Sequence, residues 1–145
     1  MGFLSGLFES EEKKRRKSHF RNLVAVAMAD GDIDDDETQL LLLLGQKNYL
    51  TPAEIQQVLQ SPEDVRFVVP QNPRQALDYL WEMVQMMMID GHIHAREKAF
   101  CKGIALRYGF RPAVVDKIVD TIIEGIARGV VAEMALHRLL ANLDD

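Results

Sequence analysis

The sequence predicts an all-α protein, a single-domain bundle of seven or eight helices, and three observations lead to this fold class. Apolar residues recur with a helical period along most of the chain, motifs that start helices precede these stretches, and a block of sequence is repeated. The repeat has an offset of 60 residues and pairs residues 20–59 with residues 80–119 without a gap. Each unit is expected to hold a helix, an Asp-Gly loop, a second helix, a turn and a third helix.

Helix-starting motifs place several of these elements. Residues 51–54 (TPAE) form a capping-box motif with a proline in the first turn, where the threonine and glutamate side chains cap the helix start reciprocally. Residues 72–73 (NP) open the next long helix in the same way, and residues 61–64 (SPED) give a shorter start. Residues 65–70 (VRFVVP) resemble a strand, but their terminal proline favours an extended linker between the units.

The helix interiors indicate which residues form the core. Five consecutive leucines, Leu40 to Leu44, leave no polar face, so their helix is expected at the centre of the bundle with other helices around it. A lone cysteine, Cys101, aligns with Leu41 and is expected to be a quiet core thiol. Tyr79 and Trp81 are expected to be in the core or half-buried. Further residues expected in the core are Met83, Met86, Met87, Met88, Val115, Ile118, Val119, Ile122, Ile123, Ile126, Leu136, Leu139 and Leu140.

Composition restricts the class of protein. The chain has 145 residues, of which 48% are hydrophobic and 27% charged, as in a soluble domain with its own core. The formal net charge of -5 argues against a nucleic-acid partner. With one cysteine, no internal disulfide forms, and no apolar stretch is long enough for a membrane span, so a cytoplasmic location is expected. Residues 1–17 form an amphipathic, charged N-terminal segment and residues 18–142 the helical domain.

The repeated loops read ADGDIDDDE over residues 29–37 and IDGHIHARE over residues 89–97. Local structure explains part of this pattern: the glycines end a helix in the left-handed conformation, the isoleucines fill the gap, and an aspartate and a glutamate form a capping box for the next helix. The residues with these roles are Gly31, Gly91, Ile33, Ile93, Asp34 and Glu37. Asp30, Asp32 and Asp90 have no role in this interpretation.

A divalent cation would explain the remaining acidic residues. Six of the eight residues from Asp30 to Glu37 are acidic, and like charges this close repel one another unless a cation joins them. Calcium or magnesium suits such oxygen ligands. The motif matches the second half of an EF-hand loop, but the first half is absent, so water or a second loop would complete the shell. The candidate ligands in this loop are Asp30, Asp32, Asp34 and Glu37.

The second loop favours a different ion, because two histidines replace two of the aspartates. Imidazole together with carboxylate suits zinc or manganese better than calcium. The candidate ligands are Asp90, His92, His94 and Glu97. If the two units pack about a pseudo-two-fold axis, the two loops would lie side by side and share one site.

The paired loops, with the leucine-rich LLLLLGQ after the first and the aromatic FCKGIALRYGF after the second, resemble the tellurite-resistance TerB-like family over residues 18–142. The resemblance implies an all-helical domain of two related halves, no established enzymatic activity, acidic loop residues suspected of binding metal, and links to tellurium resistance and stress responses. The family's acid-glycine pair and its helix-starting glutamate fall on Asp30-Gly31, Asp90-Gly91, Glu37 and Glu97. The histidines at 92 and 94 depart from the family pattern.

The function expected from the sequence is therefore a non-enzymatic module that binds a divalent cation and contacts a protein partner. A metal-free acidic scaffold that binds a basic partner is the main alternative. Peripheral membrane contact through residues 2–17 is another, with apolar residues entering the interface and the basic run at 13–17 meeting anionic lipid. A metal-dependent hydrolase is least favoured, because the chain has no glycine-rich phosphate loop and no serine-elbow motif. The sequence does not indicate an oligomeric state.

Overall fold

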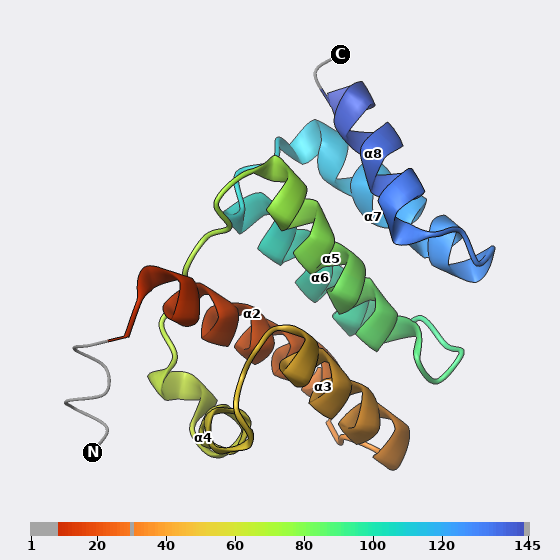
Figure 1. Cartoon of the computed structure of the whole chain (residues 1–145). Coiled ribbons are helices and arrows are strands. Elements are labelled where there is room, and N and C mark those ends of the chain that lie inside the picture. Colours follow the sequence, from red (N-terminus) through yellow and green to blue (C-terminus); the bar gives the residue numbers. More distant parts are fainter. Residues whose placement is uncertain (1–8, 30, 144–145) are drawn as a thin grey trace.

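A computed structural model describes residues 9–29 and 31–143, and this part of the chain is all-helical and contains no strand. Within these residues, seven α-helices and one short 3-10 helix follow one another (Figure 1). They are α2 (Glu11–Met28), α3 (Asp35–Lys47), α4 (Pro52–Gln60), η1 (Pro62–Asp64), α5 (Pro73–Met88), α6 (Ala95–Arg107), α7 (Pro112–Ala127) and α8 (Ala132–Leu143). The predicted fold class is confirmed.

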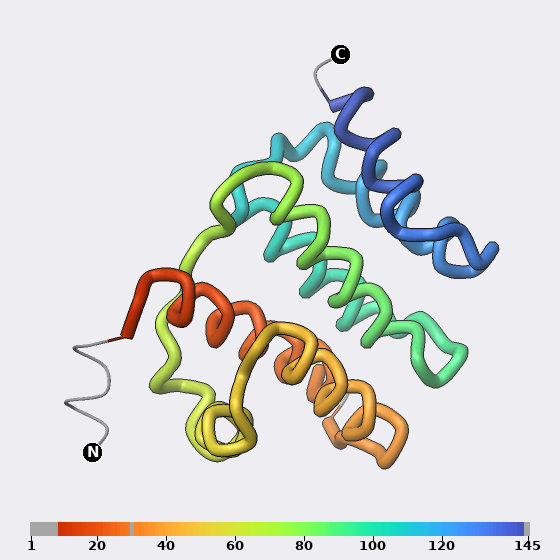
Figure 2. Tube along the Cα trace, viewed as in Figure 1, coloured from red at the N-terminus to blue at the C-terminus, as the bar shows by residue number. Residues whose placement is uncertain are grey.

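Helix α5 lies in the middle of the bundle. It contacts α2, α3, α6, α7 and α8, and the trace in Figure 2 shows α2 and α3 on one side of it, α7 and α8 on the other, and α6 behind it. Most of α5 is buried, including three methionines that are at most 1% exposed, Met83, Met86 and Met87. The predicted core role of the methionine run is therefore confirmed, apart from the partly buried Met88.

The leucine run does not occupy the centre of the bundle, so that prediction is wrong. Helix α3 packs against α2, α4 and α5 and leaves its outer side in solvent. Leu41 and Leu44, three residues apart, point into the core, whereas Leu42 is 43% and Leu43 63% exposed. The five leucines indicate a helix with an apolar inner face, but the pattern does not show how many faces of that helix are covered by other helices.

Local motifs start the helices as predicted. At α4, Thr51 Oγ1 accepts from the Glu54 backbone N–H at 3.2 Å, and Glu54 Oε1 accepts from the Thr51 N–H at 2.9 Å, which completes the capping box. At α5, Asn72 Oδ1 accepts from the Gln75 N–H at 2.8 Å. Residues 66–70 form neither helix nor strand, which agrees with the predicted linker.

Helix boundaries keep the offset of 60 residues. Helices α3 and α6 span 35–47 and 95–107, α2 and α5 end at Met28 and Met88, and α4 and α7 start at Pro52 and Pro112. These matching ends follow from matching local signals, and the pseudo-two-fold relation of the two units stays a prediction.

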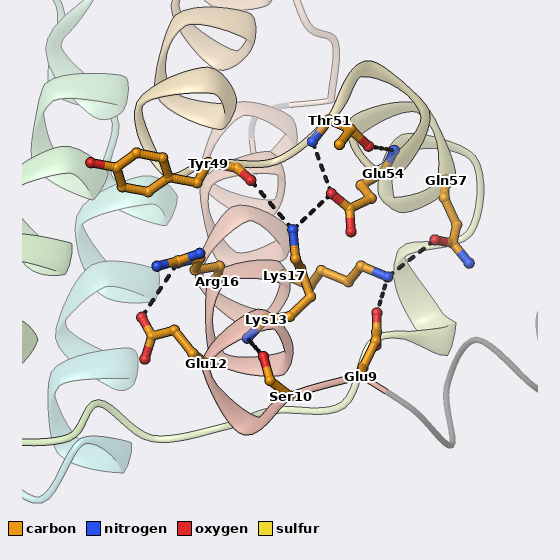
Figure 3. Close-up of polar contacts among 10 residues, drawn as sticks. All are labelled: Glu9, Ser10, Glu12, Lys13, Arg16, Lys17, Tyr49, Thr51, Glu54 and Gln57. Atoms are coloured by element: carbon orange, nitrogen blue, oxygen red, sulfur yellow. Dashed lines mark hydrogen bonds and ion pairs between the residues drawn. The ribbon is translucent and has the colours of Figure 1, made fainter.

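The basic run near the N-terminus is part of α2, which continues without a break across residue 17. Each of its five basic side chains pairs with an acidic side chain of the protein, as Figure 3 shows for three of them. The pairs are Lys13–Glu54, Lys14–Glu11, Arg15–Glu12, Arg16–Glu12 and Lys17–Glu9. Four carboxylates thus face the five positive charges of the run within the fold, because Glu12 pairs with both Arg15 and Arg16. No helix in the described part of the chain is long and apolar enough to cross a membrane.

Tyr49 adopts a conformation that suits glycine. It follows the C-cap of α3 with a φ of 62°, and the N–H groups of Tyr49 and Leu50 bond back to the carbonyls of Gln46 and Gly45, as in a Schellman motif. The equivalent residue after α6 is Gly109, with a φ of 102°. A bulky side chain in this region is strained by roughly 1–2 kcal/mol.

Replacing Tyr49 by glycine is expected to stabilise the protein. Relief of strain outweighs the loss of the exposed contact between the Tyr49 ring and Arg16, which is worth about 0.5 kcal/mol, so the net gain is about 0.5–1.5 kcal/mol. Urea unfolding measures this difference. The matched control is Gly109→Ala, which should destabilise, and a Tyr49→Gly variant less stable than the parent would contradict the strain argument.

Candidate functional site

Both Asp-Gly loops lie at the same end of the bundle, where α2 and α5 end. In Figure 1 the loop after α5 projects at the right of the view, and the end of α2 lies below it beside the start of α3. The glycines end their helices with positive φ as predicted, 118° at Gly31 and 83° at Gly91, and their N–H groups bond to the carbonyls of Met28 and Met88. Ile33 packs partly against the core, but Ile93 is 45% exposed, so the predicted burial of Ile93 is wrong. At Ile93 the second loop therefore lies further from the core than the first loop does at Ile33.

The first loop uses its acidic residues to start α3. Asp34 Oδ1 accepts from the Glu37 backbone N–H at 2.7 Å, and Glu37 Oε1 accepts from the Asp34 N–H at 3.2 Å. This is the predicted capping box, and Glu37 is only 5% exposed within it. Asp32 is exposed, and Asp30 lies outside the described residues. One carboxylate oxygen of each capping residue is therefore committed to the backbone.

The second loop arranges its side chains differently. Asp90 turns back over the loop: its Oδ1 accepts from the His92 backbone N–H at 2.9 Å, and its Oδ2 lies 3.2 Å from His94 Nε2. The same His94 nitrogen lies 3.8 Å from Glu97 Oε1, and Glu97 is 2% exposed. One imidazole nitrogen thus lies between two carboxylates.

A single substitution explains this difference between the loops. His94 occupies the N-cap position of α6, which Asp34 occupies in α3, and its side chain makes no capping hydrogen bond. An imidazole is longer than a carboxylate, and here it reaches Asp90 instead of the first turn. The backbone N–H of His92 lowers the pKa of Asp90 below its ordinary value, and His94 adds to this, so Asp90 stays ionised beside the ring. The loop therefore presents carboxylates to an imidazole.

His92 remains apart from this cluster, and Asp30 lies outside the described residues. The His92 and His94 ring centroids are 6.4 Å apart, and it is the His92 backbone that bonds to Asp90. Within residues 9–29 and 31–143, no three or more His, Cys, Asp or Glu side chains are placed to hold a metal ion as they stand. The three closest candidates, Asp90, His94 and Glu97, would have to turn toward a common point. Among these residues, no metal site shared by the two loops is formed either.

A second polar cluster, which the sequence did not reveal, lies inside the bundle. His19 Nε2 on α2 lies 2.7 Å from Glu82 Oε1 on α5, and the two residues are 1% and 5% exposed. Asn48 Nδ2 donates to Glu82 Oε1 at 3.0 Å, and Lys47 Nζ lies 2.8 Å from Glu82 Oε2. The His19 ring stacks on Tyr79 with centroids 3.9 Å apart. No sequence signal marks this pair, because polar residues lie one helical turn from each member. They are Arg15 and Asn22 around His19, and Asp78 and Gln85 around Glu82.

Donors around Glu82 hold it ionised despite its burial. Burial alone would raise the pKa of Glu82, but hydrogen bonds and charge from His19, with further bonds from Lys47 and Asn48, outweigh it and lower the pKa from 4.5 to about 2. Cys101, by contrast, has only burial and the nearby Glu97 charge to shift it, and its pKa rises to about 12. The predicted quiet core thiol at Cys101 is confirmed.

Comparison with known proteins identifies no relative of this chain: no family model, no curated protein and no solved structure matches it.

Proposed function

We propose that the chain is a non-enzymatic, TerB-like helical module that binds a divalent cation at its second Asp-Gly loop and uses that loop to contact a protein partner. The observation that carries the proposal is the placement of His94 Nε2, 3.2 Å from one carboxylate oxygen of Asp90 and 3.8 Å from one of Glu97. Imidazole with two carboxylates is a donor set for zinc or manganese.

We place the ion at the second loop because the candidate ligands of the first loop already cap a helix. In the first loop Asp34 and Glu37 hold the start of α3, so an ion would compete with helix capping. In the second loop the equivalent cap is absent, and the side chain at that position faces carboxylates. A calcium or magnesium ion at the first loop, held by Asp32 together with Asp34 and Glu37, is the weaker part of the proposal.

The proposed mechanism is electrostatic. The ion binds between His94 and the two carboxylates, draws the three side chains together and fixes the loop. Ile89 and Ile93 flank the site and are 39% and 45% exposed, so fixing the loop also fixes a small apolar surface. That surface is where a partner would bind. Tellurite resistance or another stress response is the setting that the family resemblance suggests.

A metal titration tests this proposal. Zinc, manganese, calcium and magnesium are added to the protein in turn while thermal unfolding is followed. An ion that binds only the folded form stabilises it by about 2.7 kcal/mol at a concentration of 100 times its Kd. Zinc or manganese is expected to raise the melting temperature most, and Asp90→Asn and His94→Ala should each remove the rise.

His137→Ala on α8 is the control, because it removes an exposed histidine far along the chain from the loop. It should leave the metal effect unchanged. If no ion changes the melting temperature, the metal proposal is wrong and the metal-free alternative gains support. In that alternative the exposed Asp32, Asp35 and Asp36 bind a basic partner directly.

A further inference from the structure

A groove opens on one face of α5, away from both Asp-Gly loops. Its volume is about 440 Å³, and it is lined by the N-terminal half of α2, the C-terminal end of α3, α5 and the first turn of α8. Glu82 lies at its buried end, Tyr49 stands at its exposed edge, and Glu133 contributes from α8. The groove exists only in the folded protein, because α2 and α8, which lie near opposite ends of the chain, meet α3 and α5 here.

The buried end of the groove presents a carboxylate whose cationic partner is easily replaced. Two of the three donors to Glu82 are held firmly: His19 is 1% exposed, and Asn48 is fixed by a second hydrogen bond from its Nδ2 to the Leu44 carbonyl at 2.8 Å. The third, Lys47, lies on the surface with 65% of its side chain exposed. A long exposed side chain gains little from a single ion pair and exchanges readily with another ammonium group.

The outer edge of the groove presents an aromatic ring. Tyr49 is 72% exposed and strained, although glycine would fit its backbone without cost. Arg16 lies over the ring with its Cζ 4.9 Å from the ring centroid. Strain retained at a residue that fills no core and borders a cavity points to a role in binding.

The protein's own side chains show which chemistry the groove favours. Each of its two recognition elements, the Glu82 carboxylate and the Tyr49 ring, already holds a cation of the protein, Lys47 in one case and Arg16 in the other. The charges that line the groove also leave an excess of one negative charge. Four are acidic, Glu12, Asp78, Glu82 and Glu133, and three are basic, Arg16, Lys47 and Arg74.

We propose that this groove binds a small organic cation, an alkylamine whose primary ammonium group replaces that of Lys47 on Glu82 and whose chain runs outward past Tyr49. A primary ammonium is required because the buried carboxylate accepts N–H donors, which a quaternary ammonium lacks. The aromatic edge adds a contact for the polarised methylenes next to the charge or for a second ammonium group. This site is independent of the metal proposed at the second loop.

The direct test is a titration of the full-length, ¹⁵N-labelled protein with butylammonium chloride and with 1,4-diaminobutane at constant ionic strength. Both are expected to cause saturable shifts of the backbone amides at residues 47–49 and 78–82. Tetramethylammonium chloride should cause none that saturate. Equal binding of tetramethylammonium, or no saturation by either amine, would overturn the proposal.

Three variants sharpen the result. Glu82→Gln should weaken butylammonium binding by at least about tenfold, since it removes the charge that receives the ammonium. Tyr49→Gly should weaken it while raising stability, so that the two readouts move in opposite directions. Lys47→Met should tighten it several-fold, because the competing ammonium is gone and the aliphatic stem remains.

The matched control for Lys47→Met is Lys102→Met. Lys102 also pairs with an acidic side chain, Asp116, at 2.8 Å, but it lies on α6 outside the groove. Its replacement should leave the affinity unchanged. Weaker binding by Lys47→Met than by the parent would overturn the replacement mechanism, and this comparison holds even if Glu82→Gln does not fold.

Discussion

The contribution of Glu82 to stability is expected to disappear as the pH falls from 4.5 to about 2, with a loss of about 3 kcal/mol. The folded protein lowers the pKa of this carboxyl group, so the unfolded chain binds a proton first as the pH decreases. The stabilisation is therefore complete above pH 4.5, where both states are ionised, and is lost through this window. Protonation would also leave His19 and Lys47 facing a neutral group inside the bundle.

Urea unfolding at a series of pH values measures this effect. The parent should lose stability more steeply between pH 4.5 and 2 than Glu82→Gln, which has no charge to neutralise at this site. At neutral pH the same variant should be less stable by about 3 kcal/mol, because one member of a buried charged cluster is missing. Asp116→Asn is the control: its pKa is also lowered, but the residue is exposed, and its removal should change the pH dependence far less. Parallel curves for the parent and Glu82→Gln would contradict the assignment.

A single methyl group at Gly45 is expected to destabilise the protein by about 1–3 kcal/mol. A Cβ at this position would lie 2.8 Å from Ile55 Cδ1 and 3.1 Å from Phe20 Cε1, so these two buried side chains, or the helices that carry them, would have to shift. At the offset of 60 residues the same three positions hold Ala105, Val115 and Leu80. In the second unit alanine replaces the glycine, and the smaller valine and leucine replace isoleucine and phenylalanine, as the packing argument requires.

Gly103→Ala is the matched control for Gly45→Ala, because both replace a helical glycine by the same residue. A Cβ at Gly103 would meet no atom within 4 Å, so only the helix propensity changes, and the variant should be more stable by about 1 kcal/mol. Chemical unfolding of the two variants should therefore give shifts of opposite sign. Shifts of the same sign would show that close packing at Gly45 does not control stability there.

Much of the helical architecture was predictable because its signals act over a few residues. The capping boxes at 34–37 and 51–54, the proline starts and the glycine ends involve groups at most one turn apart. Their geometry depends little on the rest of the fold. The same locality explains why a repeat in sequence at an offset of 60 reappears as helix ends at the same offset.

The candidate metal site was only partly predictable for the opposite reason. The residue types were visible in the sequence, but the competition between capping and ligation was not. Asp34 and Glu37 bond to the backbone of their own helix, whereas His94 turns to Asp90, and this choice depends on side-chain length and loop geometry. The exposure of Ile93 is similarly a property of the whole bundle, since it depends on whether a neighbouring element covers the loop.

By itself the sequence determined that this protein is helical, where its helices start and stop, and which residues have an apolar side, because backbone capping and helical period are local properties. The tertiary structure decided which apolar sides are covered, leaving Leu43 in solvent and placing α5 at the centre. It also brought His19 to Glu82 across 63 residues and Lys47 to the same carboxylate. A buried polar cluster of this kind depends on distances between helices that no local pattern encodes.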